Sequence, residues 1–390
     1  MLEAKWRWAR AVLAVLGGMA MSGETRAEEL VIGVINPFTG PGADLGISSR
    51  QGLEPAVEEI NRAGGVLGRQ IKLVFRDDES NPQKAVAAAR ELAQRQKAVV
   101  IVGANLTHVA MAVSPVINQL KLPFMVMGTG NAVIDPKTFP YSFRTSVSND
   151  IEAAVVVDYV SKRFKAPGII VDATAYGQSG ESSLRKHLTE HGMKPVAVEK
   201  FNLSDIDMTG QVNALKEAGA DVMLVWGLGG PLAYLARSAD RAGFHVPAFG
   251  GLGVHQVAFP NLAGAAGKDW SATTYRAFSR ALRTDSITPQ ERAYLDAQKK
   301  RWGSELGASV EVNALWEDTL RLLVDAIKRA NSTDPDAIKA ALEQTSGFKG
   351  MVSTYSFGPA KHDAMERSAM TIAYATGVED HIKTRIPDAP

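Results

Sequence analysis

Residues 64–82 read GGVLGRQIKLVFRDDESNP and have the pattern of one complete joint of an α/β protein, by which we mean the end of one helix, a strand, and the start of the next helix. The two glycines that open the stretch predict the end of a helix, because glycine takes a left-handed turn without steric cost. Residues 70–75 are apolar enough for a strand buried on both faces. The polar run 77–81 predicts a loop, and Pro82 begins the next helix, with Asn81 or Ser80 as its N-cap. Such a loop lies at the carboxyl edge of its sheet, where open α/β sheets bind ligands.

The composition is that of a folded protein with more than one domain. A chain of 390 residues exceeds one typical core, and 45% hydrophobic with 22% charged residues is ordinary for a globular protein. The chain has no cysteine. This excludes disulfides, cysteine-ligated zinc, thiol catalysis and the lipidated cysteine of a bacterial lipoprotein.

The first 27 residues predict a secretory signal peptide. Lys5, Arg7 and Arg10 precede a short apolar run at 11–21, and a cleavage site follows before residue 28. The run is well short of the roughly 20 residues that a membrane span needs, although an N-terminal anchor helix is the alternative. We therefore expect a soluble protein exported to the periplasm.

The mature chain is nearly neutral. Removing residues 1–27 takes four basic residues from 43 and two acidic residues from 42, which leaves a net charge of −1. Such a chain lacks the excess of positive charge with which proteins bind nucleic acid or an anionic membrane. We expect neither as a partner.

The order of apolar and polar runs predicts two α/β lobes. Strand–helix units repeat over residues 30–127 and restart at 149, which predicts parallel sheets with right-handed crossovers. The predicted strands are 30–35, 70–75, 99–102, 123–127, 168–171, 196–201, 222–225, 248–249, 354–357 and 370–374.

The sequence after about residue 277 is largely helical, and we assign it mainly back to the first lobe. Lobe 1 then comprises 28–148 plus about 277–350, and lobe 2 comprises 149–276 plus about 351–390. Several segments must cross between the lobes, which predicts a hinge with a ligand cleft between them.

Three enzyme-like motifs fit their patterns poorly. HLTEH, from His187 to His191, matches a zinc pattern, but a polar helix end next to Gly192 explains it better. GQSGE, around Ser179, has glutamate where the nucleophile elbow needs glycine. The glycines of 227–230 do not have the spacing of a dinucleotide loop. We predict no catalytic residue, no metal and no cofactor.

Polar residues follow two strands of the first lobe. Asn105, Leu106 and Thr107 follow the third predicted strand, and Thr129 follows the fourth. Both threonines stand near predicted helix N-termini, where backbone N–H groups and hydroxyls can bind a carboxylate. Either threonine alone is equally well explained as a helix cap. Their shared edge of one sheet favours the binding interpretation.

Two motifs give the chain a resemblance to a known family. They are A-x-x-x-I-N-x-x-G-G-x-x-G at 56–68 with D-D-x-x-x-P-x-x-A at 77–85, and IIVDATAYGQSGESSL at 169–184. Across the mature chain, the sequence resembles the leucine/isoleucine/valine-binding proteins, the periplasmic solute receptors of ABC importers. The resemblance implies a type I periplasmic binding protein with two Rossmann-like lobes, three crossovers and a small ligand in the cleft. The implied partner is an ABC permease of the inner membrane, and we expect a monomer.

The resemblance also implies roles for single residues. Thr107 matches the hydroxyl residue that holds the ligand's carboxylate, and Thr129 and Asn131 match a pair that helps to hold the head group. Tyr176 matches an aromatic residue of the second lobe that closes over the ligand, whereas Leu45 stands where the family has an aromatic residue in the first lobe.

Departures from the family pattern bear on the ligand. Gly229 replaces a second aromatic residue, with Trp226 close by, and Leu252 replaces the acidic residue that pairs with the ligand's ammonium. Because a buried ammonium needs a carboxylate, we predict a ligand with a carboxylate but no α-ammonium. Its body would be apolar or aromatic and its polar tail would meet His255. A contribution from Asp150 would instead restore an amino-acid ligand.

The sequence therefore predicts a periplasmic receptor that closes over a small carboxylate. An amino-acid receptor of the same family and a sensory module that signals to a membrane partner are the alternatives. An enzyme would need a nucleophile–base pair in the cleft, and the sequence offers none.

Overall fold

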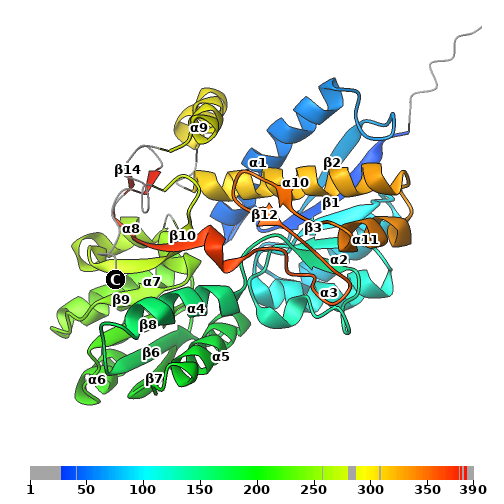
Figure 1. The fold of residues 1–390 in the computed structure, drawn as a ribbon. Coiled ribbons are helices and arrows are strands. Elements are labelled where there is room, and N and C mark those ends of the chain that lie inside the picture. Colours follow the sequence, from blue (N-terminus) through cyan, green and yellow to red (C-terminus); the bar gives the residue numbers. More distant parts are fainter. Residues whose placement is uncertain are drawn as a thin grey trace, which may run out of the picture.

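The computed structural model has two α/β lobes side by side (Figure 1). The predicted signal peptide lies outside the described residues. None of the helices in the described part combines the length and the apolar composition that a membrane crossing requires. The structure describes residues 28–40, 42–256, 258–279, 287–306 and 309–376, together with the backbone of 378–379 and 382–383.

The first lobe is built on a parallel five-stranded sheet, as the strand–helix alternation predicted. Its strand order is β2 (Ile71–Asp77), β1 (Leu30–Asn36), β3 (Val100–Gly103), β4 (Phe124–Val126) and β5 (Ser142–Arg144). The helices that follow these strands are α1 (Ala43–Arg62), α2 (Pro82–Gln94) and α3 (Thr107–Gln119), with the short turn η1 (Asn131–Val133) after β4.

The joint at residues 64–82 has the predicted structure. Gly65 has φ +77°, and a Cβ there would lie 2.0 Å from the Arg69 carbonyl oxygen, so only glycine fits. At the other end, the Asn81 side chain caps α2 by accepting from the backbone N–H groups of Gln83 and Lys84. Asp77, which the sequence placed in the loop, is the last residue of β2, and its carboxylate accepts from the Phe38 N–H in the loop after β1.

The second lobe is built on a six-stranded sheet in which only the edge strand β13 is antiparallel. Its strand order is β13 (Met370–Tyr374), β10 (Trp270–Tyr275), β9 (Ala248–Gly250), β8 (Val222–Trp226), β6 (Pro167–Asp172) and β7 (Ala197–Phe201). Its helices are α4 (Asn149–Val160), α5 (Ala175–Glu190), α6 (Thr209–Glu217), α7 (Gly229–Arg241) and α8 (Ala258–Ala263), with the turns η2 (Leu252–His255) and η3 (Gly264–Gly267). The fold class predicted from the sequence is confirmed, although neither β5 nor β10 was predicted.

Both sheets are covered on two faces, which explains their continuous apolar strands. In β1, Ile32 and Val34 face the core under α1 and α10 (Val310–Ala330), whereas Ile35 faces the core under α2 and α3. The helices α1 and α10 lie in close contact because Gly52 has no side chain. A Cβ at Gly52 would lie 2.2 Å from the carbonyl oxygen of Asn313 in α10.

The late helices return to the first lobe. They are α9 (Pro289–Trp302), α10 and α11 (Pro335–Glu343), with the turn η4 (Gly303–Glu305) between the first two. The Gln298 side chain of α9 donates to the carbonyl oxygen of Gln51 in α1. Arg301 and Glu58 form an ion pair at 2.7 Å between the same two helices.

The segment after α11 contacts elements of the first lobe. The short pair β11 (Phe348–Lys349) and β12 (Thr354–Tyr355) packs on α10, because the Tyr355 hydroxyl donates to the Asp318 carboxylate at 2.9 Å. Asp363 pairs with Arg144 of β5 at 2.6 Å. We therefore propose that the last crossing lies after the turn η5 (Arg367–Ala369), where β13 begins, rather than near residue 351. A backbone hairpin, β14 (Val378–Glu379) with β15 (Ile382–Lys383), follows β13.

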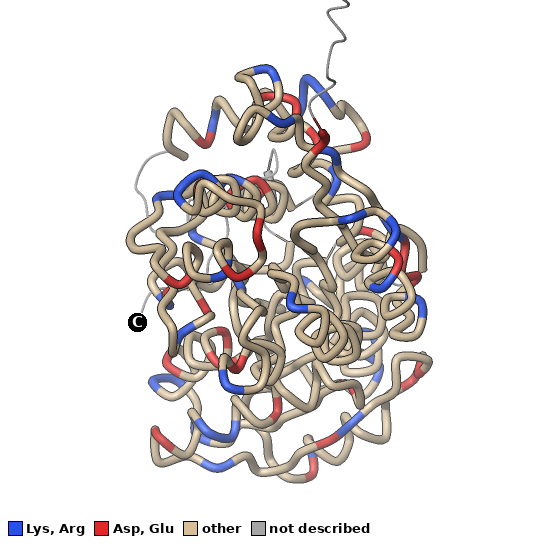
Figure 2. The backbone as a smooth tube through the Cα atoms, turned by 90° about the vertical axis from the view of Figure 1, so that its right-hand side faces the viewer, with Lys and Arg blue, Asp and Glu red and all other residues tan. Residues whose placement is uncertain are grey.

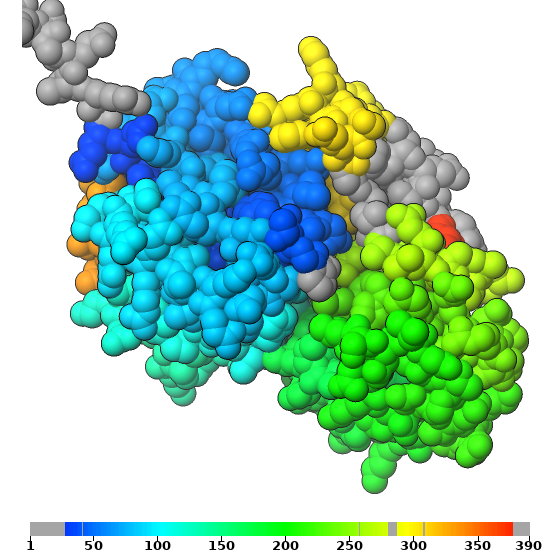
Figure 3. Space-filling view, turned by 180° about the vertical axis from the view of Figure 1, so that it is seen from behind, coloured from blue at the N-terminus to red at the C-terminus, as the bar shows by residue number. Residues whose placement is uncertain are grey.

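The lobes meet along a boundary that is visible between the blue–cyan and the green halves of the molecule (Figure 3). Basic and acidic residues alternate along the chain instead of gathering by sign on the side drawn in Figure 2.

Candidate ligand-binding site

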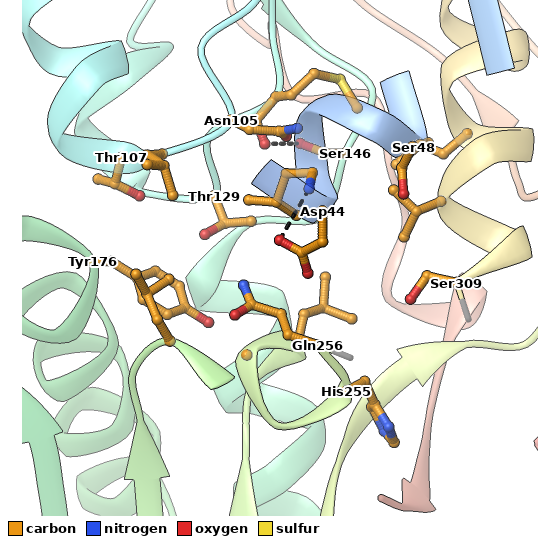
Figure 4. Close-up of a pocket in the computed structure, with 18 of the residues that line it drawn as sticks. Asp44, Ser48, Asn105, Thr107, Thr129, Ser146, Tyr176, His255, Gln256 and Ser309 are labelled. Carbon is orange, nitrogen blue, oxygen red and sulfur yellow. Dashed lines mark hydrogen bonds between the residues drawn. The ribbon is translucent and has the colours of Figure 1, made fainter. Parts of the chain in front are cut away.

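A cavity of about 310 Å³ lies between the lobes (Figure 4). Its walls come from the carboxyl ends of first-lobe strands, from the starts of α1, α3, α5 and α10, and from η2. The residues that line it are Asp44, Leu45, Ile47, Ser48, Asn105, Leu106, Thr107, His108, Met127, Thr129, Ser146, Thr174, Tyr176, Leu228, Leu252, Gly253, His255, Gln256, Tyr275, Glu305, Ser309, Glu311, Val312 and Leu315.

One wall presents hydroxyl groups beside a helix N-terminus. Thr107 is the first residue of α3 and is only 4% exposed, and its hydroxyl accepts from the Gly130 N–H at 3.2 Å. The N-cap position of α3 is Leu106, and no side chain caps this helix end. Thr129 and Ser146 lie on the same wall. The cap interpretation of Thr107 is therefore wrong, and α3 presents an uncapped N-terminus at a cavity, as anion sites do.

The second lobe contributes an aromatic wall. Tyr176 lies in the first turn of α5, and burial raises the pKa of its hydroxyl well above the ordinary value, so the phenol is neutral. Its ring packs against the ring of Trp226, and the two ring centroids are 6.3 Å apart. Trp226 is fully buried under this contact and does not line the cavity.

The turn η2 is fixed from beneath by one buried carboxyl group. Glu152 of α4 accepts from the Leu252 N–H and from the Thr273 hydroxyl, each at 2.7 Å, through the same oxygen. Its side chain is fully buried, and burial raises its pKa to about 7. Glu152 thus sets the position of Leu252 and His255, which line the cavity.

A third wall is acidic, and the sequence interpretation missed it. Asp44, Glu305 and Glu311 line the cavity together with Ser48 and Ser309. No lysine or arginine is among the lining residues in the described ranges. Asp44 directly precedes Leu45, which the sequence did identify, so attention to the neighbouring acidic residue would have found it.

Local structure places Asp44 at the cavity. It belongs to the first turn of α1, whose start packs on the preceding loop. Gly46 permits this approach, because a Cβ there would lie 2.0 Å from the Pro37 carbonyl oxygen. The Asp44 carboxylate accepts from the Leu45 N–H at 3.0 Å, and burial raises its pKa.

The structure brings most of the sequence-predicted site residues together. The eight that line the cavity are Leu45, Asn105, Leu106, Thr107, Thr129, Tyr176, Leu252 and His255. Gly229 and Trp226 lie behind the wall. Gly229 begins α7, and its N–H donates to the Gln256 side chain at 2.7 Å, so it positions a lining residue instead of lining the cavity itself.

Asn131 and Asp150 lie beside the cavity at a contact between the lobes. The Asn131 amide donates to the Ser183 hydroxyl of α5 at 3.0 Å and accepts from the Asp150 N–H at 3.2 Å. The Asp150 carboxylate pairs with Lys186 at 2.9 Å and with His187 at 3.2 Å. Neither side chain is among the residues that line the cavity, and the Asp150 carboxylate is already paired with Lys186.

The HLTEH segment has a structural explanation within α5. His187 lies between Asp150 and Glu190, and the neighbouring His191 pairs with Asp158 at 2.9 Å. Within the described residues, no group of three or more potential metal ligands lies together.

Comparison with known protein sequences gives a matching family and relatives of similar length. A family model described as "Periplasmic binding protein" matches residues 29–377. The leucine-, isoleucine-, valine-, threonine- and alanine-binding protein of Pseudomonas aeruginosa is 28% identical over 338 residues, which cover 85% of this chain and 86% of that protein.

Solved structures share the fold. A type 1 periplasmic binding protein of Bordetella pertussis has a TM-score of 0.81 at 28% identity, and the match covers 88% of this chain and 96% of that one. A solute-binding protein of Rhodopseudomonas palustris in complex with 4-hydroxybenzoate has a TM-score of 0.78 at 21% identity over 92% and 96% of the two chains, and it supports the fold alone.

Proposed function

The chain belongs to the periplasmic binding protein family, whose members are solute-binding receptors and not enzymes, and we propose that it delivers a small carboxylate to an ABC importer. The predicted signal peptide supports a periplasmic location. The proposed partner is the membrane permease of that importer, which would receive the ligand from the closed receptor.

One observation carries this proposal. The cavity between the lobes is lined by the uncapped N-terminus of α3 with Thr107, Thr129 and Ser146 on the first lobe, and by Tyr176 on the second. Hydroxyls and backbone N–H groups at a helix N-terminus bind a carboxylate through charge-assisted hydrogen bonds, without needing a basic side chain. The aromatic ring and the leucine side chains around it suit an apolar ligand body.

The contacts between the lobes support binding by closure. Leu228 at the start of α7 packs against the first-lobe core that contains Leu106, while Asn131 bonds to Ser183 across the boundary. A ligand that touches both walls stabilises this closed arrangement over an open one by its differential affinity for the two.

A thermal-shift screen on refolded, ligand-free protein tests the proposal. The panel holds amino acids, together with aliphatic and aromatic carboxylic acids that lack an amine, each paired with its uncharged primary amide. A ligand at 100 times its dissociation constant adds about 2.7 kcal/mol to the free energy of unfolding. We expect shifts from acids and none from their amides.

Two variants complete the test. Thr129→Ala removes a cavity hydroxyl and should reduce the shifts. Thr189→Ala removes an exposed hydroxyl that bonds to the Arg185 carbonyl oxygen on α5, and it should leave them unchanged. Equal shifts from acids and amides, or equal effects of the two variants, would contradict carboxylate binding at this wall.

A further inference from the structure

We propose that Arg144, held in place by Asp363, positions the loop at residues 128–130, which carries Thr129 on the hydroxyl wall of the cavity. Neither Arg144 nor Asp363 is among the described residues that line the cavity. The inference rests on the proposed function, because it explains how the wall that would hold the ligand's carboxylate is given its shape.

The Arg144 guanidinium bonds to the loop on both sides of Thr129. Its Nη1 donates to the carbonyl oxygen of Gly128 at 3.0 Å and to that of Gly130 at 2.7 Å. The Arg144 side chain is only 1% exposed, so these charge-assisted bonds form away from water and are strong. One nitrogen thus fixes the direction of both carbonyl groups that flank Thr129.

The carbonyl oxygen between these two is also bonded outside the cavity. The Thr129 oxygen accepts from the N–H of Asn149, the first residue of α4, at 2.8 Å. All three carbonyl oxygens of the loop are therefore taken by residues that do not line the cavity. In a planar trans peptide the N–H points opposite to the C=O. The Gly130 N–H accordingly points the other way and donates to the hydroxyl of Thr107, a lining residue.

This direction matters for an anionic ligand. A carbonyl oxygen is the negative end of its peptide group, and one turned into the cavity would repel a carboxylate. Without Arg144, the oxygens of Gly128 and Gly130 would also need another donor, because a buried carbonyl group without a hydrogen bond is costly. The nearby hydroxyls of Thr107 and Thr129 could then serve the loop instead of the ligand.

Asp363 holds the guanidinium from the other side. Its two carboxylate oxygens accept from Nε at 3.0 Å and from Nη2 at 2.6 Å, and this two-point pairing leaves Nη1 for the loop. The backbone fixes Asp363 in turn. The Arg144 N–H donates to the His362 carbonyl oxygen at 2.8 Å, and the Ala364 N–H donates to the Arg144 carbonyl oxygen at 2.9 Å. Residues 362–364 therefore run beside β5 and carry Asp363 opposite Arg144.

Stability alone does not explain this choice of residues. A well-packed apolar pair of similar volume often stabilises a fold as much as a buried ion pair does. An apolar pair cannot donate to two carbonyl oxygens, and lysine lacks the planar group that reaches the carboxylate and the loop together. The arrangement is therefore specific for the loop that bears Thr129.

Amide hydrogen exchange and calorimetry on the full ligand-free protein test the inference. Asp363→Asn removes the charge that holds the guanidinium and keeps the size of the side chain. We expect faster exchange of the amides of residues 127–131. The probes for affinity are 4-methylpentanoate, leucine and benzoate. We expect those that bind to lose about 10- to 100-fold in affinity, the range for one hydrogen bond to a charged group.

Two further variants separate positioning from general stability. Arg144→Lys keeps a charge opposite Asp363 but cannot reach both carbonyl oxygens, so it should act as Asp363→Asn does. In protein that already carries Thr129→Ala, Asp363→Asn should weaken the affinity less than it does in the wild type, because the two residues act through the same loop. A purely structural role would give equal losses in the two backgrounds.

Tyr355→Phe is the matched control. Tyr355 lies in the same late segment of the chain, and its buried hydroxyl donates to Asp318 of α10 at 2.9 Å. The variant therefore also loses a contact with the first lobe, but one away from the loop at 128–130. It should lower the melting temperature while leaving the exchange of residues 127–131 and the affinity for the probes unchanged.

The outcomes distinguish this inference from the proposed function. Unchanged exchange of residues 127–131 in both Asp363→Asn and Arg144→Lys would overturn the inference and leave the receptor function standing. Faster exchange with unchanged affinity would show that the loop is held for stability alone, which also overturns it. If Tyr355→Phe weakens the affinity as much as Asp363→Asn, the effect is one of general stability. If none of the three acids binds the wild type, carboxylate binding fails and the role of Arg144 in it fails too.

Discussion

Replacing Glu152 with glutamine should stabilise the protein at neutral and alkaline pH. Glu152 is fully buried, one of its oxygens accepts two hydrogen bonds, and the other oxygen has no partner in the described part of the chain. A buried carboxylate with an unpartnered oxygen disfavours the ionised form, which is why its pKa rises from 4.5 to about 7. Glutamine has the shape of the protonated acid and does not titrate.

The sign of the effect follows from proton binding. Between pH 4.5 and about 7 the folded protein keeps the Glu152 proton while the unfolded chain loses it, so the folded state binds more protons. The free energy of unfolding therefore falls as the pH rises through this window. The difference between the two pKa values corresponds to about 3 kcal/mol of unfolding free energy. Above this pH window, the wild type is therefore less stable by about that amount than it is below the window.

Thermal and urea unfolding of the ligand-free protein between about pH 4.5 and pH 8 measures this contribution. Glu152→Gln should match the wild type at the acidic end and exceed it by up to about 3 kcal/mol at the alkaline end. That gain corresponds to about 6–12 °C for domains of this size. The control is Glu217→Gln at the end of α6, where the residue is exposed. A variant less stable than the wild type at every pH would refute the reasoning, because Glu152 would then be a stabilised anion.

Three further predictions follow from single contacts. Gly52→Ala should lower the free energy of unfolding by about 3 kcal/mol, since its Cβ would meet the backbone of Asn313 at 2.2 Å, and denaturation in urea measures this. Asn131→Ala removes hydrogen bonds between the lobes and should weaken ligand affinity about 2- to 10-fold by calorimetry, with small-angle scattering showing a more open ligand-free form. Asp363→Ala leaves the buried guanidinium of Arg144 without its 2.6 Å partner and should cost about 3 kcal/mol, whereas an unchanged melting temperature would show that water replaces the pair.

The features that the sequence predicted well are those with a local cause. The joint at 64–82 combines glycine turns, an apolar strand and an N-cap, and each of these acts within a few residues, as Gly65 and Asn81 show. The repetition of such joints fixed the parallel sheets. It also brought Thr107 and Thr129 to one edge, because the carboxyl ends of parallel strands lie together.

The features that the sequence did not reveal depend on distant partners. The strand β10 forms because β9 and β13 pair with it from both sides, and a short apolar run alone does not show that. Within residues 354–365, Tyr355 and Asp363 contact α10 and β5 of the first lobe. These partners are far away along the chain, so the hydrophobic periodicity of each segment does not indicate them.

The sequence also did not show in which direction individual side chains point. Trp226 ends strand β8 and Tyr176 follows strand β6 of the second lobe, yet only Tyr176 reaches the cavity, since Trp226 fills the space left by Gly180 and Gly251. Asn131 comes from the predicted loop but turns toward Ser183 of the other lobe. Position along a strand end therefore indicates the neighbourhood of the site and not which side chains face it.

The ligand argument from the sequence depends on one aligned position. Leu252 lines the cavity, and the acidic residues that line it come from other segments of the chain. The cavity is lined by both lobes, and its hydroxyl wall of Thr107, Thr129 and Ser146 stands on the first lobe. The carboxylate of the proposed ligand would therefore be held there before the second lobe closes. The uncharged wall of Tyr176 and Leu252 would then exclude water over a ligand that is already held at its polar end.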